Sequence, residues 1–433
     1  MNSPVNTPAP QHEGLISAEG RPASGAWLAK ARTDAAARLT QMGLPKRRDE
    51  YWKWTRPDAL LAEQAAPAAA FDYGDEQPVF HAVDRLKIVF VDGVFDAEAS
   101  DDLSGEGLEI ERLAEAAKAD IHWASGLYGA LETRGHNPVD RPLAAHNSAM
   151  ATDGVLIRAT GQVSRPVSVM YRHISDTSDA ILHHVVKVEE GASLTLLENG
   201  TAAARLSMVT EIDVADGASF HHVRAQGRDH GRHVLTHIFA RLGRESVFKS
   251  FTMAVNGMLT RNECVIEILG DDAIAHVAGA ALGDGADGAF LHDDTVFVTH
   301  DAVNCESRQV FKKVLKNGAT GIFQGKILVK AGAQKTDGYQ KSQSLLLDED
   351  AQFLAKPELE IYADDVACSH GSTSGAIDEE ALFYLRSRGV PERIATDLLV
   401  LAFLADTIEE IEDADIADDI VSRLEAWLER HRG

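Results

Sequence analysis

The sequence has few cysteines and no long apolar run, and each shortage narrows the class of protein. Its 433 residues include only three cysteines, Cys264, Cys305 and Cys368. An odd number without regular spacing predicts free thiols in a reducing compartment rather than a disulfide framework. The longest apolar run, Leu398–Ala405, is far shorter than the roughly 20 residues of a membrane-spanning helix. The first residues also lack the basic segment and apolar core of a secretory signal. We therefore expect a cytoplasmic protein without a membrane partner.

Basic residues are fewer than acidic ones. The chain has 42 Lys and Arg and 67 Asp and Glu, so its net charge is −25. Such a chain will not hold a phosphate backbone, so nucleic acid and anionic membranes are poor partners. A nucleotide loop is missing as well. The stretch Gly318–Ile327 has three residues where a phosphate loop has four, and Ile327 replaces the magnesium-binding Ser or Thr. The sequence therefore predicts no ATP site in this chain.

The first third of the chain predicts a tail followed by a small mixed α/β domain over residues 26–146. Residues 1–25 are rich in Pro, Ala, Ser and Gly, which is typical of a disordered tail. Apolar residues recur at helical spacing over 26–42, and a second helical pattern covers 108–133. A strand with a turn is expected over 86–95. The aromatic residues Tyr51, Trp52 and Trp54 are expected to anchor this domain to its neighbour.

Residues 147–375 predict a β-solenoid. Short strand-like runs alternate with turns, and one turn pattern recurs: an aliphatic residue, two others, Gly or Asp, then Ala. Its fourth position, which suits a left-handed turn residue, is occupied in turn by Gly191, Gly217, Asp272, Gly318, Gly332 and Asp350. A β-sandwich would also give short strands, but stacked rungs of a solenoid explain why one turn recurs.

Residues 376–433 predict a helical domain. Asp378 is a candidate helix N-cap, and Gly389 and Pro391 separate the first helix from the second. The second helix is apolar on more than one face. One stripe comprises Ile394, Leu398, Leu401 and Ala405, and another comprises Leu399 and Phe403. Either this helix is buried in its own bundle, or one stripe packs on the chain and the other docks into a partner. A final amphipathic helix should have an acidic outer face.

The stretch Lys356–Gly375, KPELEIYADDVACSHGSTSG, holds the strongest candidate site. Its start alternates polar and apolar residues like a strand, and Cys368 and His370 are then two residues apart. In a strand both side chains point to one face. A thiol and an imidazole suit iron or zinc, but a closed site needs more ligands. Asp364 and Asp365 could add oxygen ligands, although a turn role is the simpler interpretation. Otherwise the pair is structural, or another chain completes the site.

Other polar residues are weaker candidates. Cys264 and Cys305 are expected to fill the core. The adjacent pairs His183-His184 and His221-His222 cannot each bind one ion, because neighbours in a strand point to opposite faces. An alternative function is a β-helix enzyme acting on carbohydrate with a carboxylate pair, such as Asp293-Asp294 or Asp364-Asp365. The aromatic content of 6% does not favour a sugar-binding groove.

The stretch Lys356–Gly375 resembles the signature of SufD proteins in the SufB/SufD family of the SUF iron–sulfur cluster assembly machinery. The family's cysteine and histidine fall on Cys368 and His370. The resemblance also covers Gly43–Pro45, Asp49–Thr55, Asn304–Gln352 and Arg388–Ile411. It implies a mainly β protein with a right-handed parallel β-helix core, a small N-terminal α/β region and a C-terminal helical domain.

The resemblance also implies a function and partners. The chain would be a non-catalytic scaffold that pairs with a SufB-type paralogue, docks the SufC ABC-type ATPase and passes clusters to apo-proteins. Cys368 and His370 would contribute to a nascent iron–sulfur cluster, held transiently and shared with the partner. The ATPase would bind around Arg388, Ile394, Leu398, Leu399, Leu401 and Phe403. In isolation the chain could pair with a second copy of itself. A purely structural partner without a ligand of its own is a further alternative.

Overall fold

The computed structural model of the chain describes residues 22–70, 77–227, 230–286 and 288–431. Most of the predicted disordered tail over residues 1–25 therefore lies outside the described residues.

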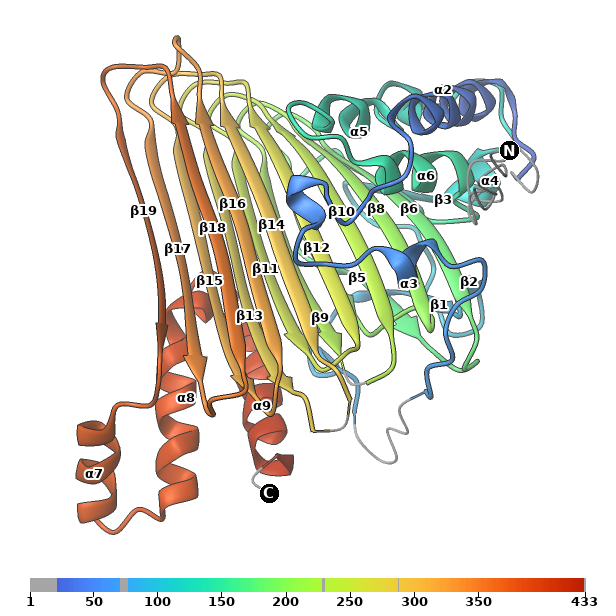
Figure 1. Cartoon of the computed structure of the whole chain (residues 1–433). Coiled ribbons are helices and arrows are strands. Elements are labelled where there is room, and N and C mark those ends of the chain that lie inside the picture. Colours follow the sequence, from blue (N-terminus) through green and yellow to red (C-terminus); the bar gives the residue numbers. More distant parts are fainter. Residues whose placement is uncertain (1–21, 71–76, 228–229, 287, 432–433) are drawn as a thin grey trace, which may run out of the picture.

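Two long sheets form the body of the molecule (Figure 1). The ten-stranded sheet contains β1 (Leu86–Val91), β2 (Val94–Asp96), β5 (Val167–Arg172), β7 (Ser193–Asn199), β9 (Ser219–Gly227), β11 (Val247–Val255), β13 (Ile274–Asp284), β15 (Glu306–Lys316), β17 (Asp337–Leu346) and β19 (Ala367–Gly375). The nine-stranded sheet contains β3 (Leu108–Arg112), β4 (Val155–Ala159), β6 (Asp179–Val188), β8 (Arg205–Val214), β10 (His233–Leu242), β12 (Leu259–Ile268), β14 (Leu291–His300), β16 (Thr320–Val329) and β18 (Gln352–Ile361).

From β4 onward the chain alternates between the two sheets, so each rung adds one strand to each sheet. Neighbouring rungs pair in parallel. The rung length varies, since Leu194 pairs with Phe220 and Thr260 with His292. This alternation gives a β-solenoid of about seven turns, which confirms the predicted β-helix. A sandwich of hairpins would instead place antiparallel neighbours together.

The recurring turn explains how the chain changes sheets. Gly191, Gly217, Asp272 and Gly318 all have positive φ, between 61° and 76°, whereas Gly332 and Asp350, at the same position of the pattern, do not. Glycine adopts this conformation without steric cost, and Asp tolerates it better than most residues. Between the turns, alternate side chains point into the space between the sheets, which we call the bore, and form its largely apolar core.

Short helices and a strap cover the outer face of the nine-stranded sheet (Figure 1). The helices are α2 (Ala26–Met42), η1 (Glu50–Trp52), α3 (Asp58–Leu61), α4 (Leu113–Ala116), η2 (Trp123–Gly126), α5 (Ala130–Gly135) and α6 (Pro142–Met150). The strap, residues 43–61, crosses this sheet as far as β18. The prediction of a helical pattern over 108–133 is wrong for its first residues, Leu108–Arg112, which form β3. The strands β1 to β3 extend the solenoid sheets, and the expected boundary at residues 146–147 falls within α6.

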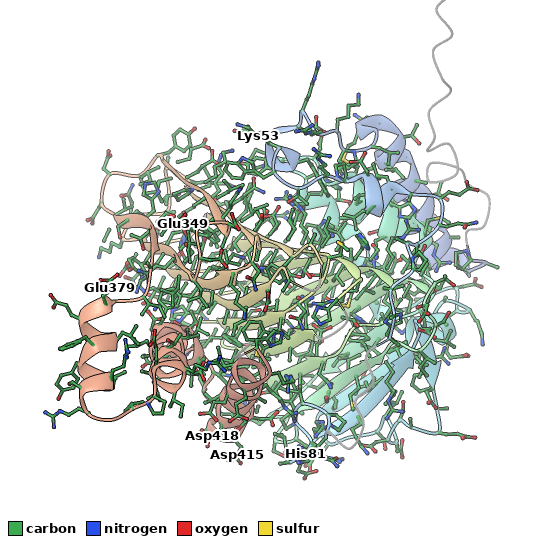
Figure 2. The ribbon with its side chains drawn as sticks, turned by 60° about the horizontal axis from the view of Figure 1, so that its bottom comes forward. Lys53, His81, Glu349, Glu379, Asp415 and Asp418 are labelled. Carbon is green, nitrogen blue, oxygen red and sulfur yellow. The ribbon has the colours of Figure 1, made fainter. Side chains whose placement is uncertain are left out.

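The C-terminal helices α7 (Glu379–Ser387), α8 (Glu392–Ile408) and α9 (Ala414–Arg430) follow the last rung, and α8 and α9 pack on the outer face of the ten-stranded sheet (Figure 1). Asp378 caps α7 by accepting hydrogen bonds from two backbone N–H groups, as predicted. Figure 2 shows Glu379 of α7 and Asp415 and Asp418 of α9 pointing away from the body. The two α9 residues confirm the acidic outer face predicted for the final helix. Within the described ranges, no helix combines the length and the apolar character that crossing a membrane requires.

Candidate functional site

The candidate site lies on the last rung of the solenoid, where β18 and β19 each pair on one side only. β18 can carry Pro357 because proline, which lacks an N–H, is tolerated in edge strands. The turn before β19 is fixed by its backbone: the N–H of Asp365 donates to Gln334 Oε1 at 2.9 Å, and the Asp365 carbonyl accepts from the Lys335 N–H at 2.5 Å. Asp364 and Asp365 thus belong to a turn at the end of the bore.

Cys368 faces into the bore at the start of β19. It pairs in register with Gly338 of β17, and a Cβ atom added to Gly338 would lie 3.1 Å from the Cys368 sulfur. The half-buried thiol packs beside the apolar cluster that includes Ile327 and Val329. Burial raises the pKa of the Cys368 thiol, and nearby Asp337 raises it further against a hydrogen bond from the Gly338 backbone. The thiol is accessible, but a cation or metal is needed to hold it as thiolate.

His370 follows on the same face of β19, so the predicted common orientation of the two side chains is confirmed. It pairs in register with Gln340 of β17, and its side chain is exposed at the end of the solenoid. In the part of the chain that the structure describes, three or more metal-ligating side chains do not come together anywhere. Cys368 and His370 therefore offer two metal-ligating groups on one face of β19, which is fewer than a closed metal site needs.

The outer face of the last rung is tied to the strap. Lys356 of β18 forms an ion pair with Glu50 at 2.6 Å, and the Tyr51 hydroxyl donates to Glu358. Leu359 and Ile361 point the other way, toward the bore, as the alternating pattern predicted. Burial and the hydrogen bond to Glu358 raise the pKa of Tyr51 far above its usual range. The strap thus fixes β18, and with it the rung that carries the candidate site.

The exposed apolar residues of the C-terminal domain lie on α7 and α8. Phe383 is 73% exposed, Tyr384 56%, Ile394 42% and Leu398 46%. The remaining predicted partner-binding residues are placed as follows: Leu401 and Phe403 pack partly against the solenoid, Leu399 is half-buried, and Arg388 is exposed beside Tyr384. The face of α8 that packs on the sheet comprises Val400, Leu404, Thr407 and Ile408. Neither predicted stripe is this buried face, so most of both stripes remains at or near the surface.

The other two cysteines are buried, as predicted. Cys264 points into the bore, and burial raises the pKa of its thiol to about 12. Cys305 lies in a turn between rungs, where its thiol donates to the carbonyl of Gly270. Both are thiols of the core.

The adjacent histidines also face opposite ways. The His183 ring contacts Glu211 outside the bore, whereas His184 contacts Tyr171 inside it. His221 and His222 are split in the same manner. Neither pair can close on one ion, as the strand geometry predicted.

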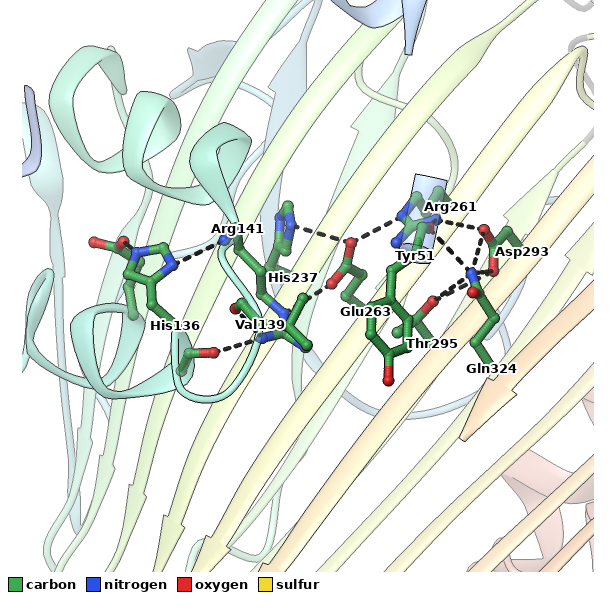
Figure 3. A network of polar contacts seen from close by, with 12 residues as sticks. Tyr51, His136, Val139, Arg141, His237, Arg261, Glu263, Asp293, Thr295 and Gln324 are labelled. Atoms are coloured by element: carbon green, nitrogen blue, oxygen red, sulfur yellow. Dashed lines mark hydrogen bonds and ion pairs between the residues drawn. The ribbon is translucent and has the colours of Figure 1, made fainter. Parts of the chain in front are cut away.

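The carboxylates proposed for a carbohydrate enzyme are enclosed in ion pairs. Asp293 is fully buried under the strap, where Arg261 lies 2.5 Å away and Gln324 donates to it (Figure 3). Asp294 points into the bore and pairs with Lys313 at 2.5 Å. The two side chains lie on opposite faces of β14, so they cannot flank one glycosidic bond.

Sequence reasoning missed the polar residues of the bore. Glu198 accepts from Arg224 at 2.6 Å and contacts His222 at 2.7 Å, and Arg224 also donates to Thr236 at 3.1 Å. Burial alone would raise the pKa of Glu198, but Arg224 and His222 hold it well below its usual range. The sequence did contain a signal for these residues, because a polar residue at an inward-facing position of a strand pattern indicates a polar group in the bore. Near the last rung, Gln309 and Gln340 are inward and polar in the same way.

The β-solenoid thus carries a thiol and an imidazole on its open last rung, beside a helical domain with exposed apolar residues. Residues 171–403 match the family described as SUF system FeS cluster assembly, SufBD core domain. The chain therefore belongs to the SufBD family, and its role is in iron–sulfur cluster assembly. The matched range runs from β5 to α8.

Individual relatives agree along most of the chain. The chain is 28% identical over 403 residues to the iron–sulfur cluster assembly protein SufD of Escherichia coli, covering 89% of this chain and 90% of that protein. It is 27% identical over 412 residues to a SufBD family protein of Synechocystis, covering 90% and 88%. It is also 27% identical over 296 residues to SufD of Bacillus subtilis, covering 66% and 67%.

Proposed function

We propose that this chain is a SufD-type, non-catalytic scaffold on which iron–sulfur clusters are assembled together with a SufB-type paralogue. Cys368 and His370 contribute ligands to a nascent cluster, which is cargo and is passed on to apo-proteins in the cytoplasm. The observation that carries the proposal is their common orientation on an edge strand. A thiolate and an imidazole are suitable iron ligands, and the remaining ligands would come from the partner.

The open last rung supports the pairing. Strands β18 and β19 leave unpaired backbone N–H and C=O groups on the edges of both sheets. Proteins seldom leave such edges uncovered, because these groups pair readily with another strand. A paralogous solenoid can meet both edges at once, which would enclose Cys368 and His370 between the chains. A second copy of this chain could occupy the same edges when the paralogue is absent.

The helices α7 and α8 support a separate docking site for a SufC-type ATPase. Phe383, Tyr384, Ile394 and Leu398 are apolar and exposed on one helical domain. Large apolar side chains exposed on neighbouring helices are a common feature of interfaces. The site is distinct from the last rung, so one chain could hold both partners simultaneously. The ATPase would supply the nucleotide chemistry, for which this sequence has no recognisable loop.

The test is capture of the tagged chain from its own cells, with identification of bound proteins and measurement of iron and sulfide. Wild-type protein should recover an ABC-type ATPase and a paralogous scaffold. Cys368→Ala and His370→Ala should keep both partners but lower the cluster yield by about tenfold or more, because each removes a ligand. Ser369→Ala is the matched control, since Ser369 lies between them on the opposite face of β19.

Two results would contradict the proposal. If the wild-type chain is recovered alone, the assembly interpretation fails. If both variants keep the wild-type cluster yield within the complex, the chain is a structural partner without a ligand of its own.

A further inference from the structure

The residue beneath His370 in the bore is Gln340. The pairing of β17 with β19 places Gln340 in register with His370, and two residues further on it places Ser342 with Ser372. The hydroxyl oxygens of these two serines are 3.0 Å apart, which shows that this face of both strands points the same way. Gln340 has no exposed surface, whereas His370 is exposed.

The amide of Gln340 is bound on one side by a neighbouring amide. Its Nε2 donates to Oε1 of Gln309, the inward residue on the preceding strand β15, at 2.7 Å. Gly325 on the opposite sheet leaves the necessary space, because a Cβ atom there would lie 2.2 Å from Nε2 of Gln340. With Nε2 engaged by Gln309, Oε1 is the acceptor that remains.

That acceptor is buried, and it has no hydrogen-bond partner among the described residues. A buried polar atom left unpaired is unfavourable, so native structures rarely keep one without a reason. The inward neighbour of Gln340 on the β19 side is the imidazole of His370. A neutral imidazole has one N–H donor and one nitrogen with a free lone pair, so it can serve an acceptor below and a metal above at once.

We propose that Gln340 is a positioning residue for His370: its Oε1 accepts the N–H of one imidazole nitrogen and so leaves the other nitrogen free to bind iron. This inference rests on the proposed function of His370. Histidine ligands of metals usually donate their second N–H to such an acceptor, which fixes the tautomer and the ring orientation. Gln309 acts one step further back by orienting the Gln340 amide. Cys368 differs, because Gly338 beneath it provides space rather than an acceptor.

The experiment reads the tautomer of His370 directly. The full-length chain is labelled with ¹⁵N-histidine, and His370→Asn assigns its ring nitrogens in a two-bond proton–nitrogen correlation spectrum at about pH 8.5, above the usual imidazole titration. The wild-type imidazole should show two well-separated nitrogen shifts, as one tautomer does. Gln309→Met/Gln340→Met removes both amides together, so no new unpaired group is buried and the fold is retained. In this variant the two nitrogen shifts should move toward each other, as they do when the tautomers interconvert.

Ser342→Ala is the matched control, because Ser342 is the next inward residue on β17 and pairs with Ser372 instead. It should leave the His370 shifts unchanged. A Gln340→Asn variant, whose shorter amide cannot span the same distance from β17, should resemble the double variant.

Averaged shifts in the wild-type chain, or unchanged shifts in the double variant, would overturn the proposal. This outcome is separable from failure of the proposed function, which is read from the cluster yield of Cys368→Ala and His370→Ala. If those variants lose the yield while the double variant keeps both the yield and the tautomer, His370 is a ligand but Gln340 does not position it.

Discussion

At the scale of single residues, the bore holds ionisable side chains whose burial couples stability to pH. His300 is fully buried on β14, where its Nε2 contacts the Ser307 hydroxyl at 2.8 Å. Burial lowers the pKa of His300 to about 4. The unfolded chain therefore binds a proton at this residue near pH 6.5, while the folded chain does not. The stabilisation is complete above about pH 6.5 and is lost as the pH falls toward 4.

His300→Gln should reduce this dependence, because glutamine can keep a contact with Ser307 but does not titrate. Between pH 7.5 and 5, the wild-type free energy of unfolding should fall by about 2 kcal/mol more than that of the variant. Urea unfolding at the two pH values measures the difference. Equal losses in wild type and His300→Gln would show that His300 takes up its proton without unfolding.

At the scale of elements, the strap depends on one buried arginine. Arg261 of β12 donates to the Tyr51 carbonyl at 2.8 Å and pairs with Asp293 and Glu263 (Figure 3). Its guanidinium also lies 4.2 Å from the centre of the Trp52 ring. Burial alone would raise the pKa of Glu263, but the nearby charges of Arg261, His237 and Arg141 lower it to about 2. The buried charges are thus balanced as a group, and the strap covers them.

Arg261→Met should break this balance and loosen the strap. It leaves Asp293 buried without its ion-pair partner and Glu263 with Arg141 alone, and such a loss typically costs about 3–5 kcal/mol. The matched control is Arg244→Met, which removes an exposed ion pair with Asp216 and should cost about 1 kcal/mol or less. Urea unfolding compares the two costs, and hydrogen exchange over residues 49–55 reports the strap. Equal costs, with unchanged exchange over 49–55, would show that Arg261 does not hold the strap.

The sequence predicted the elements better than their contacts. The dense aromatics Tyr51, Trp52 and Trp54 indicated an anchor. Tyr51 and Trp52 are buried between the strap and the sheet and Trp54 is half-buried, but nothing local indicated Arg261 as a partner. On α8 the periodicity could not select a face, because the helix is apolar on more than one face. The outer face of the ten-stranded sheet decides this, since it buries Val400 and Leu404, whereas Leu401 and Phe403 of the predicted stripes pack against it only in part.

At the scale of the whole molecule, the recurring turn and the alternating strands were sufficient to predict a solenoid. Which strands pair could not be derived in the same way, because the rung length varies and pairing joins residues far apart in sequence. The strands β1 to β3 joined the sheets against expectation for this reason. Cys368 and His370 were identifiable because strand geometry alone puts them on one face. Gln340 was not, because its position relative to His370 follows from the register of two rungs.

The open last rung leads to a prediction for the assembled molecule. β19 pairs with β17 on one side only, so about every second backbone N–H of β19 points away from the solenoid. These amides should exchange rapidly with deuterium in the isolated monomer, because no strand covers them. If the paralogous scaffold joins at this edge, the exchange of β19 should slow by about tenfold or more in the complex. β11, in the middle of the same sheet, is the internal control and should be protected in both states. Unchanged exchange in β19, with slowed exchange on α7 and α8 alone, would place every partner on the helical domain and leave Cys368 and His370 open to solvent in the complex.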